Sequence, residues 1–114
     1  KKTQEIVFPE PVTPCINIHM RSTKFKNFEK AEYLVKLRKP RKELQAEGIC
    51  DYPYPDKTNK ILVNPHQKDD YVLETLIHEI IHAYIWELSE TKVTRMARSI
   101  VRIIKDLGFE IKLK

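Results

Sequence analysis

The stretch LETLIHEIIHAYIWELSE, residues 73–90, largely determines the fold that this chain can adopt. Its apolar residues recur every three or four positions, which predicts an amphipathic helix. The predicted stripe consists of Val72, Leu73, Leu76, Ile77, Ile80, Ile81 and Tyr84. His78 and His82 are four residues apart, so they project from one side of that helix, about 40° apart around its axis. Both histidines can therefore bind the same ion.

The pattern His-Glu-x-x-His at residues 78–82 predicts a zinc site. Zinc accepts neutral imidazole nitrogens and prefers four ligands in a tetrahedron. Glu79 follows the first histidine directly, and in this pattern its carboxylate can take a proton from a water that the metal activates. Two histidines and a glutamate are costly in an otherwise apolar helix unless they have partners. The competing interpretation is a chance match of three fixed letters in a structural helix.

The segments that flank this helix predict a hairpin before it and a second helix after it. Residues 48–65 (GICDYPYPDKTNKILVNP) indicate a β-hairpin that turns at PDKTNK, and Asp69 or Asp70 is placed to cap the first helix. Ser89 can cap the second helix, which Gly108 would end. The predicted apolar face of that helix consists of Val93, Met96, Ala97, Ile100, Val101, Ile104 and Leu107.

The N-terminal half carries weaker patterns. Three prolines in residues 1–15 predict an extended arm over the surface. CINIHM, residues 15–20, alternates apolar and polar residues and predicts a short strand, as does FEIKLK at residues 109–114. Residues 24–39 have apolar side chains at near-helical spacing and predict a helix that ends before Pro40, although YLVKL within this segment also fits a strand.

Together these elements predict one domain, residues 1–114, with an α+β fold. A small antiparallel sheet would pack on helices, and a C-terminal helical hairpin would carry the His-Glu-x-x-His motif. The 114 residues are 41% hydrophobic and 32% charged, which is typical of a globular domain. No apolar run approaches the roughly 20 residues that span a bilayer, so we expect no membrane contact. Two cysteines without a CxxC spacing favour a reducing, cytoplasmic location.

Three stretches resemble known zinc peptidases. ETLIHEIIHAYIW, residues 74–86, resembles the active-site helix of SprT-like (Spartan-type) zinc metallopeptidases, and residues 46–65 are similar to the hairpin that leads into it. Residues 88–111 resemble small phage-encoded zincin-like proteins, in which an acidic residue opens the helix after HExxH. The resemblance implies a minimal zincin-like domain with zinc on His78 and His82 and with Glu79 as the general base.

The third metal ligand departs from the SprT-like pattern, which usually supplies a downstream histidine, because this chain has no histidine after His82. We predict Glu90, which lies just past the helix break, where a turn could aim it at the metal. A helix-capping role is the alternative for Glu90. Glu74, one turn before His78, is predicted to orient a ligand. The remaining candidates are Glu87, on the opposite side of the helix, Asp106, at the far end of the second helix, and His66 and Cys50 on the hairpin.

These features predict a zinc-dependent metallopeptidase that hydrolyses a protein or peptide substrate through a metal-activated water. A hairpin edge strand, KILVN at residues 60–64, could pair with an extended peptide. The net charge of +5 and the run KLRKPRK, Lys36–Lys42, are compatible with contact to nucleic acid, and the alternative is a basic face that is simply solvated. The alternative function is a non-catalytic, zinc-stabilised module that binds nucleic acid or a protein partner through this basic face. The sequence leaves the oligomeric state open.

Overall fold

A computed structural model describes residues 15–18 and 21–113 of the chain. The strands are β1 (Cys15–Ile18), β2 (Ser22–Lys26), β3 (Glu32–Leu37), β4 (Gly48–Cys50), β5 (Asn59–Val63) and β6 (Glu110–Leu113). The helices are a 3-10 turn η1 (Lys42–Leu44), α1 (Asp69–Tyr84) and α2 (Glu90–Asp106). The predicted α+β class and C-terminal helical hairpin are confirmed. The predicted N-terminal arm lies outside the described residues, except for Cys15, which begins β1.

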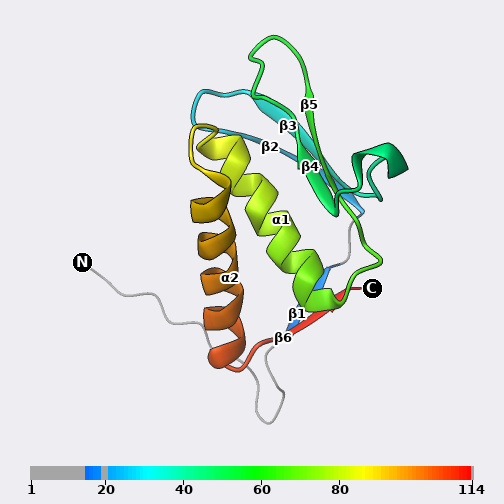
Figure 1. Cartoon of the computed structure of the whole chain (residues 1–114), viewed down its shortest axis with the longest axis vertical. Helices are drawn as coiled ribbons and strands as arrows, with labels where there is room; N and C mark the ends of the chain where they lie inside the picture. Colours follow the sequence, from blue (N-terminus) through cyan, green and yellow to red (C-terminus); the bar gives the residue numbers. More distant parts are fainter. Residues whose placement is uncertain (1–14, 19–20, 114) are drawn as a thin grey trace, which may run out of the picture.

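The main sheet joins two hairpins through their inner strands. Its order is β2-β3-β5-β4, in which β2–β3 and β4–β5 are antiparallel and β3–β5 is parallel. The sheet is therefore mixed, whereas the sequence predicted antiparallel pairing throughout. One face of the sheet lies against α1, and α2 packs on the other side of α1 (Figure 1). β1 and β6 form a separate parallel pair near the start of α1.

The core lies between the sheet and α1. Alternate residues of the two central strands face the helix, as the two-residue period of a strand requires. Tyr33 and Val35 of β3 and Ile61 and Val63 of β5 are buried against Val72 and Ala83 of α1. The core holds α1 against the sheet along most of the helix. It therefore also sets the position of His78, Glu79 and His82 relative to β4.

The predicted helix at residues 24–39 is wrong, because the segment forms β2, a turn and β3. Phe25 and Tyr33 are cross-strand partners with their rings stacked 5.3 Å apart. The turn between them is fixed by Asn27, whose Oδ1 accepts hydrogen bonds from the amides of Glu29 and Ala31, while Lys30 takes a left-handed φ of 66°. These interactions favour a hairpin over the helix that the spacing alone predicted.

Asn27 also ties this turn to the end of α1. Its buried Nδ2 donates to the carbonyl of Ala83 at 3.0 Å. We expect Asn27→Ala to lower the free energy of unfolding by about 1–3 kcal/mol, because the substitution leaves buried backbone groups without partners. Urea denaturation measures this. Asn27→Asp keeps the two acceptor interactions but sets a buried carboxylate oxygen against the Ala83 carbonyl, so it should not recover the stability. Equal stability of Asn27→Ala and the unchanged chain would contradict this anchor.

The ends of the helices agree with the sequence in part. Ser89 caps α2, since its hydroxyl accepts from the amide of Lys92, and Gly108 follows α2 with φ 94°, as predicted. The predicted aspartate cap of α1 is wrong: Lys68 is at the N-cap position, and the Asp69 carboxylate accepts from the Leu113 amide instead. Among the described residues, no helix is long and apolar enough to cross a membrane.

The predicted apolar face of α2 divides into two parts. Val93, Ala97 and Val101 are buried, in the layer where α2 packs on α1. Met96, Ile100 and Leu107 remain exposed, as does Ile103. The packing therefore uses only part of the stripe that the sequence shows.

Candidate metal centre

Two helices and one strand build the candidate metal centre. α1 presents the His-Glu-x-x-His residues toward β4, and its last turn ends at Ile85. The chain then reverses over residues 85–89, with the Leu88 amide donating to the Ile85 carbonyl. Because Ser89 caps α2, Glu90 becomes the first residue of that helix and stands next to α1. The short break thus returns an acidic side chain to the two histidines.

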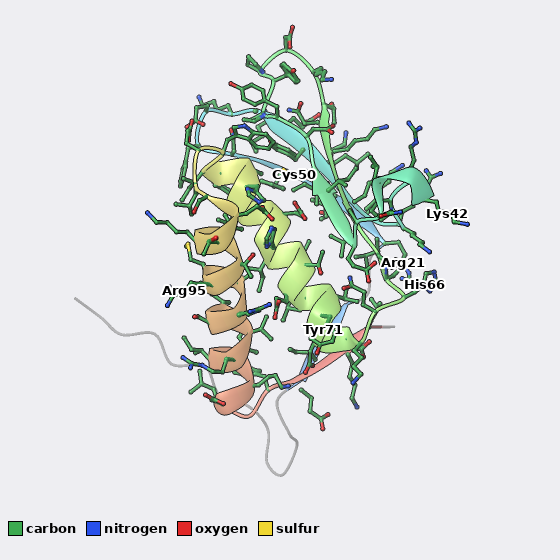
Figure 2. The ribbon with its side chains drawn as sticks, viewed as in Figure 1. Arg21, Lys42, Cys50, His66, Tyr71 and Arg95 are labelled. Carbon is green, nitrogen blue, oxygen red and sulfur yellow. The ribbon has the colours of Figure 1, made fainter. Side chains whose placement is uncertain are left out.

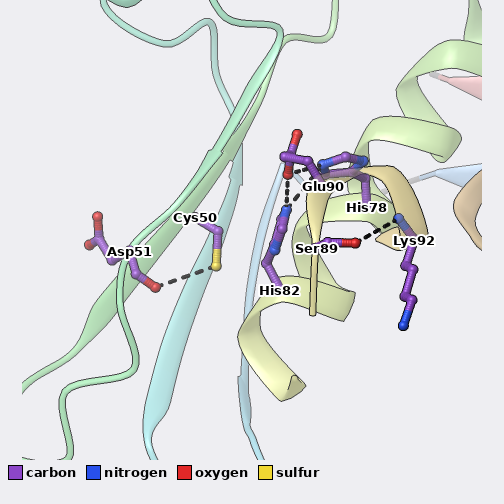
Figure 3. A network of polar contacts seen from close by, with 7 residues as sticks. All are labelled: Cys50, Asp51, His78, His82, Ser89, Glu90 and Lys92. Atoms are coloured by element: carbon purple, nitrogen blue, oxygen red, sulfur yellow. Dashed lines mark hydrogen bonds and ion pairs between the residues drawn. The ribbon is translucent and has the colours of Figure 1, made fainter. Parts of the chain in front are cut away.

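Glu90 contacts both histidines (Figure 3). Its Oε1 lies 3.1 Å from His78 Nε2 and in closer contact with His82 Nε2. The two Nε2 atoms are 3.2 Å apart. The structure therefore brings together the two predicted histidine ligands and the predicted glutamate, with one nitrogen or oxygen atom of each pointing to a common position.

Two of the three spacings among these atoms fit a zinc ion. Zinc bonds of about 2.0–2.1 Å in a tetrahedron place neighbouring ligand atoms about 3.3 Å apart. The contacts of 3.1 Å and 3.2 Å are close to that value, whereas His82 Nε2 and Glu90 Oε1 lie closer together than two zinc ligands do. Two imidazole nitrogens and a carboxylate oxygen are also donors that zinc accepts. The residues present thus fit a zinc ion on His78, His82 and Glu90.

Glu79 lies beside these ligands in a different environment. Its side chain is only 7% exposed, and the described residues provide no hydrogen-bond or ion-pair partner for its carboxylate. Its ligand atom lies within 4.8 Å of those of His78 and His82. Among the described residues no fully buried side-chain oxygen lacks a partner, so the Glu79 carboxylate is reached from the cavity that it lines, by water or by a bound ion.

The two carboxyl groups of the site differ in acidity. Burial raises the pKa of Glu79 to about 7, and the nearby charge of Glu90 adds to the effect. Burial also raises the pKa of Glu90, but the contacts with His82 and His78 outweigh it, so that the pKa is lowered overall. Glu90 is therefore the anionic, ligand-like carboxylate, and Glu79 is the group suited to exchanging a proton.

The other candidate ligands do not join the three atoms. Burial raises the pKa of the Cys50 thiol to about 12, and its Sγ donates to the Asp51 carbonyl, although Cys50 lines the same cavity. His66 is exposed and lies beyond β5, away from the site (Figure 2). Asp106 ends α2, about 24 Å along the helix from Glu90 at 1.5 Å per residue.

The two remaining acidic candidates on and after α1 also stay apart from the three atoms. Glu74 pairs with Arg98 at 3.7 Å and lines a pocket with His78, without a hydrogen bond to it. Glu87 is exposed and lines none of the pockets around the motif.

A cavity of about 440 Å³ opens beside the ligands. β4 forms one wall and α1 the other, and Figure 2 shows Cys50 on β4 facing this space. The cavity is lined by Gly48, Ile49, Cys50, His78, Glu79, His82, Trp86 and Glu90. KILVN, which the sequence suggested as an edge strand, is the wrong strand for that role, because β5 lies between β3 and β4. The described edge strand at the cavity is β4.

One edge of β4 is left unpaired by the sheet. The Glu47 carbonyl accepts from the amide of Asn64, which follows β5, at 2.8 Å, and the Asp51 amide donates to the Lys60 carbonyl of β5 at 3.0 Å. Backbone groups of an antiparallel strand alternate in direction, so those of Gly48 and Cys50 point away from β5. They therefore face the open edge at the level of the metal ligands.

Gly48 permits the close approach of β4 to α1. A Cβ atom at this position would lie 2.5 Å from Thr75 Cγ2 and 2.9 Å from Glu79 Oε2. We expect Gly48→Ala to lower the free energy of unfolding by about 1–3 kcal/mol, as overpacking does, and to displace Glu79. Thr75→Ser removes the nearer atom, so the double variant should recover part of the loss in urea denaturation. An unchanged Gly48→Ala protein would show that this contact is not restrictive.

The sequence predicted the three converging residues but not the wall of the cavity. Gly48 was predicted only as part of a hairpin and Cys50 as a remaining candidate ligand, whereas both line the cavity together with Trp86. The scarcity of glycine was an available signal for Gly48, because the chain has only two. No protein-family model, curated protein or solved structure matches the chain. The interpretation of the site therefore depends on its own residues.

Proposed function

We propose that this protein is a zinc-dependent metallopeptidase, with His78, His82 and Glu90 holding the ion. The observation that carries the proposal is the convergence of His78 Nε2, His82 Nε2 and Glu90 Oε1 beside Glu79, a largely buried residue whose carboxylate has no hydrogen-bond or ion-pair partner among the described residues. Ion pairs of Glu90 with the two histidines would account for the convergence without a metal, so the placement of Glu79 beside the same cavity is what favours a metal site. A cytoplasmic location is part of the proposal, and the free thiol of Cys50 supports it.

Each residue of the site has a separate role in the proposed hydrolysis. A bound zinc ion supplies a Lewis acid that polarises a carbonyl and lowers the pKa of water toward about 7. Glu79, beside the converging atoms, would accept the proton of the attacking water and give it to the leaving amine nitrogen, as a general acid–base group does.

The substrate of this site is an extended segment of a protein or peptide. The backbone of Gly48 and Cys50 offers main-chain hydrogen bonds at the open edge of β4, which is how extended peptides add to sheets. Such pairing would hold a peptide along the cavity, across the ligand atoms. The cavity is open and shallow between one strand and one helix, so it suits a flexible chain rather than a folded one.

Hydrolysis of an unfolded protein tests this function. Purified chain loaded with one equivalent of zinc is expected to cleave reduced, denatured casein, and a chelator should abolish the cleavage, which added zinc then restores. Mass spectrometry of the products identifies the cleaved bonds. Zinc binding without any cleavage, combined with DNA binding that weakens steeply with salt, would favour the non-catalytic module and contradict the peptidase.

A further inference from the structure

An exposed aromatic cluster lies at one end of the metal cavity. It consists of Tyr52, Tyr54 and Trp86, which are 49%, 47% and 37% exposed. The Tyr52 ring meets the Tyr54 ring at 5.0 Å and the Trp86 ring at 5.3 Å, both edge to face. Trp86 in turn lies 6.1 Å from the ring of His82, a metal ligand, and lines the cavity. The three rings thus form a wall that continues from the ligands; we call it the aromatic wall.

We propose that the aromatic wall binds an aromatic or bulky aliphatic side chain of the substrate, on the N-terminal side of the cleaved bond. This inference rests on the proposed function and names the substrate class of that site. Two tyrosines come from the segment after β4 and the tryptophan from the segment after α1, so the fold brings the rings together from distant parts of the chain. Contiguous exposed aromatic rings mark binding surfaces, since their apolar faces gain by being covered.

The direction of the peptide follows from the course of β4. The strand runs from Gly48 to Cys50, and Tyr52 comes two residues later, about 7 Å farther along. Antiparallel pairing is the more common arrangement for an added strand, and it places the N-terminal part of the peptide toward Tyr52. If the carbonyl of the cleaved bond lies at the ligands, another residue of the peptide reaches the aromatic wall. That residue stands about two positions before the cleaved bond.

The charge around the wall favours a peptide over nucleic acid. Acidic residues lie within two positions of each ring in the chain: Asp51 directly precedes Tyr52, Glu87 directly follows Trp86, and Asp56 comes two residues after Tyr54. A cation does lie at the wall, where Lys57 Nζ stands 4.9 Å above the Tyr54 ring. Phosphate groups would meet mainly negative charge here, whereas nucleic-acid sites depend on basic side chains. Base stacking on this wall is therefore the less favoured use.

Trp86 reports binding directly, because it is the only tryptophan in the chain. Zinc-loaded Glu79→Gln protein would be titrated with an eight-residue peptide carrying one phenylalanine at its third position and alanine or serine elsewhere. A saturable change in Trp86 fluorescence is expected. The peptide with alanine in place of phenylalanine should bind about tenfold or more weakly, as the loss of one buried aromatic side chain implies.

Matched tyrosine variants locate the effect. Tyr52→Ala and, as a second wall variant, Tyr54→Ala should reduce the preference for phenylalanine about tenfold. Tyr71→Ala should not, because Tyr71 is an exposed tyrosine near the opposite end of α1 (Figure 2). Unchanged zinc stoichiometry and circular dichroism show that each variant is folded. Equal binding of the two peptides, or equal effects of Tyr52→Ala and Tyr71→Ala, would overturn the inference, as would a Tyr52-dependent response to single-stranded DNA alone.

The result is separable from that of the casein experiment. If the chain cleaves casein without enrichment of aromatic or bulky aliphatic residues before the cleaved bonds, the wall is not a subsite although the peptidase stands. If it cleaves nothing while Trp86 still responds to the phenylalanine peptide and not to the alanine peptide, the wall stands as a peptide-binding site and the peptidase fails.

Discussion

Glu79→Gln should bind zinc as the unchanged chain does and lose peptide hydrolysis by a factor of about 10²–10⁴, the usual contribution of a general acid–base group. The amide keeps the shape of the carboxylate but cannot carry the proton. Because the substitution also removes a buried negative charge that has no partner, the metal-free variant should be at least as stable as the unchanged chain. Initial rates on a quenched-fluorescence peptide, together with zinc stoichiometry, measure the two effects.

Glu74→Gln is the matched control for this prediction. Glu74 stands on the same helix and lines a pocket that also includes His78 and Glu79, but its carboxylate pairs with Arg98. Its loss should change the rate by less than a factor of about ten. If Glu79→Gln retained full activity, or if both glutamine variants lost activity equally, Glu79 would not be the proton carrier.

The helices and the ligand pattern were predictable because their determinants are local. The i, i+4 spacing of His78 and His82 fixes a common side of any helix, and Ser89 is a side chain that caps a helix wherever the chain reverses. Glu90 was predicted from its position after the break. Its contact with both Nε2 atoms depends on how α2 packs on α1, which only the structure shows.

The hairpin at residues 22–37 and the cavity wall were not predictable, because their determinants are not local. Phe25 and Phe28 have helical spacing, but the stacking of Phe25 on Tyr33 and the bond from Asn27 to Ala83 are contacts between distant residues. The parallel pairing of β3 with β5 likewise depends on burial of both strands against α1. Which strand forms the open edge follows from that pairing, so a pattern within residues 60–64 could not decide it.

The variant Glu90→Asp distinguishes two roles for Glu90, that of a metal ligand and that of a helix-capping acid. The shorter side chain keeps a negative charge at the N-terminus of α2, where it interacts favourably with the helix dipole, but its oxygen no longer reaches both histidines. We therefore expect metal-free Glu90→Asp to unfold within about 0.5 kcal/mol of the unchanged chain. Its zinc affinity should fall by more than the ~10–100-fold typical of residues that only support a ligand. Competition with a fluorescent chelator measures the affinity.

Thermal unfolding provides the second readout of the same prediction. Zinc at a hundredfold excess over its dissociation constant stabilises the folded chain by about 2.7 kcal/mol, which raises the midpoint of unfolding by roughly 10 °C for a domain of this size. Glu90→Asp and His82→Ala should lose this shift, whereas Glu87→Gln should keep it, because Glu87 lies outside the converging atoms. A full shift in Glu90→Asp would assign the third position to another group. Loss of stability without zinc would instead make Glu90 a capping residue, since a ligand matters only when the ion is bound.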